Sequence, residues 1–279
     1  METETNSITD RKISNRAVII FWVTVIIFSA AAEWAYCKIG DMWVALLMWI
    51  PALAAFLATY VSMRDSKERS GLAGQRALLG IKTCRSRYII MGVLIPIVYL
   101  IIPYIIYWTT HPGSVDIGGT SVINICIYAI IYLLISTVTA AGEEIGWRGF
   151  MLPALTERVG FSKAVTAVGL FWCLWHFPLL IWGGYMEGTP LWYKLCAFVL
   201  CIFPVGIIMA LLTVKSGSVW PAVFMHSAHN AFDQSIFGAI TEGEDKMYFV
   251  SETGLLTVLC VWMIAVVMSV LYSKRRNAK

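Results

Sequence analysis

The chain has 279 residues, of which 59% are hydrophobic and only 14% are charged. An average soluble domain carries roughly 25% charged residues, so this chain has too little polar surface to cover a globule in water. The composition excludes a soluble protein and indicates one that is surrounded by lipid. The net charge of +4 is then assigned to loops that face anionic lipid. No basic segment is typical of a nucleic-acid surface.

Apolar runs of about 20 residues, the length that crosses a bilayer as a helix, recur along the whole chain. They predict eight transmembrane helices, at 17–36, 42–63, 88–108, 122–147, 162–184, 191–214, 218–240 and 253–272. The longest polar stretch between them, 64–87, is too short for a separate domain. We therefore expect one all-α polytopic bundle, with a tail at 1–16, a transmembrane domain at 17–272 and a second tail at 273–279.

Lys and Arg are concentrated in alternate connections, which is the pattern that the positive-inside rule describes. Loop 64–87 is rich in them, and both tails carry several. With eight helices, all of these segments fall on one side of the membrane. The sequence thus predicts a multi-pass integral membrane protein of a bacterial plasma membrane, with both termini in the cytoplasm.

Ionisable residues inside apolar runs cost a few kcal/mol each and commonly mark functional sites. The fourth run ends in Glu143-Glu144-Ile-Gly-Trp-Arg148. Glu144 and Arg148 are i,i+4 neighbours and are expected to form an ion pair. Glu143 lies about 100° around the helix and has no basic residue at that spacing, so it is available as a general base. The alternative is an ordinary solvated helix end.

The fifth run contains His176, 14 residues after Ser162 and hence near the middle of the membrane. Pro178 removes a backbone hydrogen bond two residues later and is expected to kink or open the helix. Such a kink leaves room for water or substrate beside the ring. The alternative is a histidine that only bonds a neighbouring helix.

The seventh run places His226, Asn230 and Asp233 at i, i+4 and i+7, which predicts one polar helix face. His229 lies about 60° to the side and is expected to pair with Asp233. Polar groups from three runs lie at overlapping depth, in the cytoplasmic half of the membrane or near its centre. They predict a single buried site rather than separate contacts that hold the bundle together.

A carboxylate and a histidine can hold and deprotonate water, while a second histidine and an amide can stabilise an oxyanion. This set suits hydrolysis of an amide bond without a covalent intermediate, and no GxSxG nucleophile motif occurs. Glu143, His176 and His226 could instead bind a divalent metal such as zinc, with one position open. The sequence has no HExxH motif. It does not decide whether a carboxylate or a bound metal ion activates the water.

Three motifs on successive helices resemble those of the CPBP intramembrane proteases, which include the type II CAAX prenyl endopeptidases. The motifs are Glu143-Glu144-x-x-x-Arg148, an aromatic residue four positions before His176, and His226-x-x-x-Asn230. The family's usual Phe at the aromatic position is Trp172 here, which is expected to pack the site.

The resemblance implies an endopeptidase acting on membrane-bound peptides or proteins. In it Glu143 and His176 would activate water, and His226 and Asn230 would stabilise the oxyanion. Glu144 and Arg148 would position Glu143. A prenylated substrate does not follow from the motifs.

Two other functions stay open. The first is a non-catalytic membrane binder, for example an immunity protein that holds a partner in the same cavity. The second is a proton-coupled transporter, since membrane-embedded Glu, His and Asp also relay protons. Against the transporter, the chain shows no matching pair of broken helices in its two halves.

Overall fold

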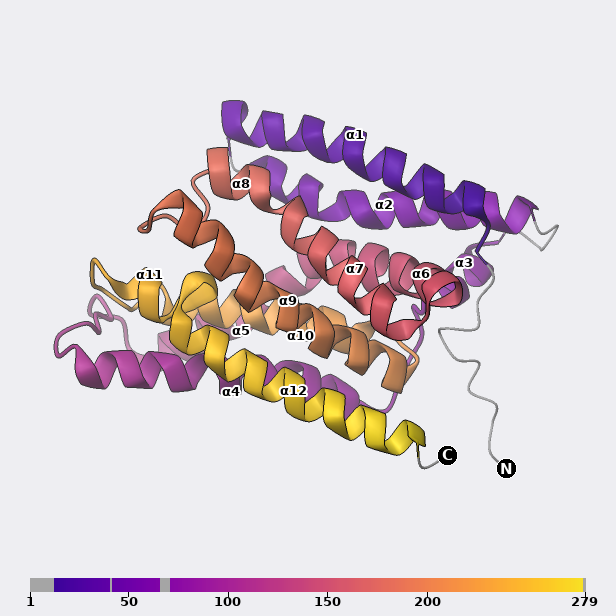
Figure 1. The fold of residues 1–279 in the computed structure, drawn as a ribbon. Coiled ribbons are helices and arrows are strands. Elements are labelled where there is room, and N and C mark those ends of the chain that lie inside the picture. Colours follow the sequence, from indigo (N-terminus) through magenta and orange to yellow (C-terminus); the bar gives the residue numbers. More distant parts are fainter. Residues whose placement is uncertain (1–12, 41, 66–70, 278–279) are drawn as a thin grey trace.

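A computed structural model describes residues 13–40, 42–65 and 71–277, which form a bundle of helices (Figure 1). Among these residues the only β-type pairing is an isolated bridge between Val115 and Thr241. The all-α fold is therefore confirmed. Most of the expected first tail, 1–12, lies outside the described residues, as do 278–279 of the second.

Within the described residues, seven helical segments are long and apolar enough to cross a membrane. They are built from α1 (Asn15–Ile39), α2 (Met42–Asp65), α4 (Ser86–Thr110), the run of α5 (Val122–Glu144), η1 (Ile145–Met151) and α6 (Leu152–Val159), the pair α7 (Phe161–Trp175) and α8 (Phe177–Trp182), α9 (Leu191–Ser216), and α12 (Leu255–Asn277). The remaining helices are α3 (Leu72–Leu78), α10 (Trp220–Asn230), η2 (Ala231–Phe237), α11 (Lys246–Phe249) and η3 (Ser251–Thr253). Helix α12 continues into the segment that was expected to be the second tail.

The expected span 218–240 is not among these seven segments. Its residues form α10 and the π-helical η2, whose polar side chains lower the apolar character of the segment. Helix α10 packs against α4, α5 and α9, so it is an internal helix shielded from lipid. Helix α10 still runs lengthwise along the bundle (Figure 1). As a result, α1 begins at the same end of the bundle at which α12 ends.

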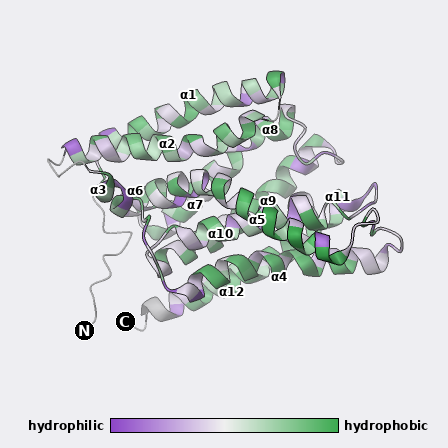
Figure 2. Ribbon diagram, turned by 180° about the vertical axis from the view of Figure 1, so that it is seen from behind, coloured by the Kyte–Doolittle hydropathy of each residue, from purple (hydrophilic) through white to green (hydrophobic). Residues whose placement is uncertain are grey.

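Apolar side chains cover the outside of the bundle, as a lipid environment requires. Apolar residues predominate along the helices, and hydrophilic ones gather mainly at the two ends (Figure 2). The first part of α5 illustrates this: Val122, Ile123 and Leu134 are all largely exposed. Helices suit such surroundings because every interior backbone group is hydrogen-bonded within its own segment.

Two glycines bring α5 and η1 close to α2. A Cβ on Gly142 would collide with the backbone of Met48, and one on Gly146 would collide with Pro51. Small residues commonly allow such close approach of membrane helices. The contact draws the end of α5, which carries the two glutamates, into the interior of the bundle.

The three expected motifs lie at irregularities of the helices. The π-helical η1 begins directly after Glu144, and η2 begins directly after Asn230. Helix α7 ends at Trp175, and α8 begins at Phe177. The break at His176 is the one predicted from Pro178, which cannot donate a backbone hydrogen bond. π-Helical turns are frequent at functional sites because they re-aim side chains.

Two native cysteines at opposite ends of the bundle test the predicted orientation. Cys37 is exposed near the end of α1, and Cys84 is partly exposed just before α4. If both termini are cytoplasmic, a membrane-impermeant maleimide should label a single-cysteine Cys37 variant in intact cells. It should label a Cys84 variant only after permeabilisation. The reverse pattern would place the termini outside.

Candidate active site

The polar motif residues surround one cavity of about 110 Å³ inside the bundle. Glu143, His176, His226 and Asn230 all contribute to its wall. The structure therefore brings together these four residues from the three motifs. Glu144 does not line the cavity.

The other walls come mainly from one end of the bundle. Tyr36 and Val44 lie at the turn from α1 to α2, Tyr185 follows α8, and Glu252 precedes α12. This end is opposite the one at which α1 begins (Figure 1). If both termini are cytoplasmic, the cavity extends from the centre toward the non-cytoplasmic side, which differs from the depth expected from the sequence.

Glu144 ties η1 to α10. Its Oε1 accepts hydrogen bonds from Nη1 of Arg148 and from Nδ1 of His226, each at 2.9 Å. The side chains of Glu144 and Arg148 are 0% and 1% exposed. The ion pair expected from the i,i+4 spacing is present. The bond to His226 was missed, because helical spacing says nothing about partners 82 residues away.

Glu143 is held by an indole rather than by a cation. Its Oε2 accepts a hydrogen bond of 2.7 Å from Nε1 of Trp172. The guanidinium of Arg148 lies over the Trp172 ring, 4.2 Å from the ring centroid. Trp172 was expected to pack against the site. Its role as a hydrogen-bond donor to Glu143 was not predicted. The one sequence clue is that Trp carries an N–H where Phe has none.

Hydrogen bonds define which nitrogen of each histidine carries a proton. Nδ1 of His176 lies 2.7 Å from the backbone oxygen of Trp172. A carbonyl oxygen can only accept, so Nδ1 donates and Nε2 keeps a lone pair. The carboxylate of Glu144 makes Nδ1 of His226 a donor in the same way. In both histidines Nδ1 is occupied by a hydrogen bond, so Nε2 is the nitrogen that remains for chemistry in the cavity.

Asp233 does not share the polar face predicted for α10. The π-helical η2 starts between Asn230 and Asp233 and changes the angular spacing, so the i, i+7 argument is wrong for this residue. Asp233 instead accepts hydrogen bonds from the hydroxyls of Tyr104, at 3.0 Å, and Ser251, at 2.8 Å. The expected pairing of His229 with Asp233 takes the form of a close approach, with ligand atoms within 4.8 Å of each other, while His229 makes its hydrogen bonds to Glu252 and Tyr99.

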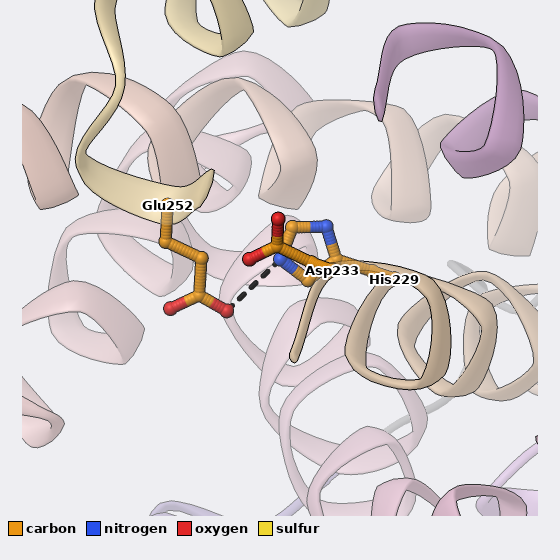
Figure 3. A group of neighbouring side chains, drawn as sticks. All are labelled: His229, Asp233 and Glu252. Atoms are coloured by element: carbon orange, nitrogen blue, oxygen red, sulfur yellow. Dashed lines mark hydrogen bonds and ion pairs between the residues drawn. The ribbon is translucent and has the colours of Figure 1, made fainter. Parts of the chain in front are cut away.

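A second buried polar network adjoins the cavity (Figure 3). Nε2 of His229 lies 3.0 Å from Oε1 of Glu252, and its Nδ1 lies 2.8 Å from the hydroxyl of Tyr99. Oε2 of Glu252 accepts a hydrogen bond of 2.6 Å from Tyr185. The predicted spans leave Glu252 in the connection between 218–240 and 253–272. No spacing rule connects it with His229, because the two lie on different elements.

Neither candidate set of residues fits a resident metal ion. Among the described residues, His229, Asp233 and Glu252 bring their ligand atoms within 4.8 Å of one another. Their carboxylate oxygens, however, already accept hydrogen bonds from hydroxyl and ring N–H groups, which are directed at the lone pairs that a cation needs. Glu143, His176 and His226, the set considered from the sequence, do not form such a group among the residues described.

Comparison with known proteins agrees with the motifs. The sequence model described as "Type II CAAX prenyl endopeptidase Rce1-like" matches residues 125–232, which include all three motifs. The chain is also 30% identical, over 184 residues, to "CAAX prenyl protease 2" of Methanococcus maripaludis. Over these residues the chain is similar to the CPBP and CAAX protease family. The match covers 61% of this chain and 64% of the relative, which is slightly less than two thirds of the relative's length.

Removing Arg148 should destabilise the fold. In an Arg148→Met variant the Glu144 carboxylate stays buried without its cation, and breaking a buried pair costs about 3–5 kcal/mol. The double variant Glu144→Gln, Arg148→Met leaves no stranded charge and should unfold at a higher temperature than the single variant. Thermal unfolding in detergent measures both.

The exposed pair Arg16–Asp65, with side chains 72% and 32% exposed, supplies the control. An Arg16→Ala change should cost less than about 1 kcal/mol. Equal stability of Arg148→Met and the wild type would show that the buried pair does not support the site.

Proposed function

We propose that the chain is an intramembrane endopeptidase that hydrolyses peptide bonds of membrane-associated proteins or peptides. The observation that carries the proposal is Glu143, a buried carboxylate on the cavity wall that is bonded to an indole N–H and, among the described residues, makes no ion pair with a cation. A histidine with a lone pair, a second histidine and an amide share the same cavity. The similarity to CAAX prenyl proteases supports a protease of this kind.

In the proposed reaction Glu143 takes a proton from water through the oxygen that Trp172 does not hold. The water is positioned by Nε2 of His176. The resulting hydroxide attacks the scissile carbonyl carbon, and the electron pair of the C=O bond moves to the oxygen. Glu143 then delivers its proton to the amide nitrogen as the C–N bond breaks, so that an amine and a carboxylic acid leave.

His226 and Asn230 are proposed to stabilise the oxyanion. The Nδ1 proton of His226 is already shared with Glu144, so His226 must carry a second proton, on Nε2, in order to donate. The Glu144 carboxylate stabilises the charge of that imidazolium ring. The amide N–H of Asn230, one helical turn further along α10, supplies a second donor to the oxyanion.

The substrate class is a separate question. The relative from Methanococcus is named for CAAX prenyl substrates, which makes a farnesylated CAAX peptide a suitable first probe. Our proposal covers any peptide bond that enters the cavity from a membrane-associated chain.

Replacing Glu143 with Gln should abolish cleavage. The base is lost while the shape is kept, and general base catalysis contributes about 10²–10⁴-fold. Truncated or released proteins are compared, by mass spectrometry, in cells carrying the wild type, Glu143→Gln and Glu187→Gln. Glu187 is exposed in the loop after α8, so its variant is expected to behave like the wild type.

Two outcomes of this comparison, and one of a separate flux assay, separate the hypotheses. Loss of specific cleavage products only in Glu143→Gln supports the protease. An intact biological phenotype in Glu143→Gln, with no change in any cleaved protein, supports a non-catalytic binder. Proton flux into proteoliposomes that depends on Glu143 supports a transporter.

Replacing Asn230 with Ala should lower kcat by about 10²–10³-fold with little change in KM, the loss typical of removing one oxyanion donor. The reason is that the donor acts mainly on charge that develops in the transition state. Steady-state kinetics on an identified substrate measures the effect, with Asn124→Ala on the exposed start of α5 as control. A higher KM at unchanged kcat would make Asn230 a substrate-binding residue instead.

A further inference from the structure

Trp172 contacts four members of the site through different parts of the residue. Its Nε1–H donates to Glu143 at 2.7 Å, and its backbone oxygen accepts from His176 at 2.7 Å. Its ring lies under the guanidinium of Arg148, 4.2 Å from centroid to Cζ. The ring also meets that of His226 edge-on, with centroids 5.4 Å apart and planes at 74°. No other motif residue makes as many of these contacts among the described side chains.

The hydrogen bond to Glu143 determines which carboxylate oxygen can act. The last torsion of a glutamate side chain is broad, so an unrestrained carboxylate would present either oxygen to the cavity. The indole fixes Oε2, which leaves Oε1 for the water. Because the Trp172 side chain is only 2% exposed, solvent cannot readily replace its N–H as the donor.

Arg148 strengthens this donor without neutralising the base. Its guanidinium bonds to Glu144 on one side and lies on the Trp172 ring face on the other. A cation over the ring attracts its electron density, which makes the N–H a better hydrogen-bond donor. The positive charge therefore reaches Glu143 through the indole, while the direct ion pair is made with Glu144.

Other tryptophans nearby show that such a contact is not a general result of burying an indole. Nε1 of Trp175, three residues later, donates to the hydroxyl of Ser29. Nε1 of Trp147 is buried without a hydrogen-bond partner among the described residues. In the part of the chain that the structure describes, only the indole N–H of Trp172 bonds to a carboxylate of the motifs.

We propose that Trp172 is a positioning residue for the hydrolytic reaction, which holds Glu143 in the orientation that activates water and couples it to Arg148. This inference rests on the proposed protease function. It predicts that the N–H group of Trp172, rather than its bulk, is what the reaction needs.

The test replaces Trp172 with 3-benzothienylalanine, which keeps the bicyclic shape and substitutes sulfur for N–H. We expect kcat to fall about 10- to 100-fold, the factor for losing a hydrogen bond to a charged group, with KM changed less than about twofold. The same replacement at Trp147 is the control and should leave kcat within about twofold of the wild type. Trp172→Phe, which also lacks the donor, should match the isostere in kcat if it folds.

Retention of wild-type kcat by the Trp172 isostere would overturn the inference and leave Trp172 as a residue that fills space. Glu143→Gln is assayed alongside, to establish that the cleavage being measured depends on Glu143. If wild-type cleavage itself does not depend on Glu143, the proposed function fails, which is a result distinct from failure of the Trp172 proposal.

Discussion

The buried contact of Glu144 with Arg148 and His226 is the interaction on which the rest of the site depends. A single carboxylate oxygen accepts hydrogen bonds from both partners in surroundings where an isolated charge would be strongly disfavoured. The contact joins η1 to α10 and fixes the side chain of Arg148, which in turn lies on the ring of Trp172. The neighbouring Glu143 is thereby left without a cation of its own, on the wall of a cavity in a lipid-surrounded bundle. The two adjacent glutamates thus have different partners, and the roles proposed for them differ accordingly.

The backbone places these groups by departing from regular helix geometry. Glycines at 142 and 146 let α5 and η1 approach α2, and the π-helical turns begin directly after Glu144 and directly after Asn230. The break at His176, which is associated with Pro178, separates α7 from α8, so the His176 ring does not lie within a continuous helix. Each irregularity would be a defect in a helix that only spans the bilayer. Here they turn polar side chains from α5, α7 and α10 toward one cavity.

Local sequence patterns predicted much of this arrangement. Composition indicated the membrane, apolar runs located the helices, and the i,i+4 spacing identified the Glu144–Arg148 pair. Contacts between distant segments could not be predicted in this way. Trp172 bonding to Glu143, Glu144 bonding to His226, and Glu252 entering the interior all require tertiary packing. The π-helical segment that contains Asp233 also escaped prediction, because spacing arguments assume a regular helix. Counting apolar runs treated 218–240 as an ordinary span, because the count does not show that α10 is surrounded by other helices rather than by lipid.

The central claim is that Glu143 itself activates the water, with no resident metal ion. The most direct test is cleavage of an identified membrane peptide by the purified wild-type protein in the presence of a strong zinc chelator, compared with the untreated protein and with Glu143→Gln. The account predicts that chelator-treated wild-type protein cleaves at the rate of the untreated protein, while Glu143→Gln is inactive under both conditions. Loss of wild-type activity on chelation and its recovery on adding zinc would contradict it.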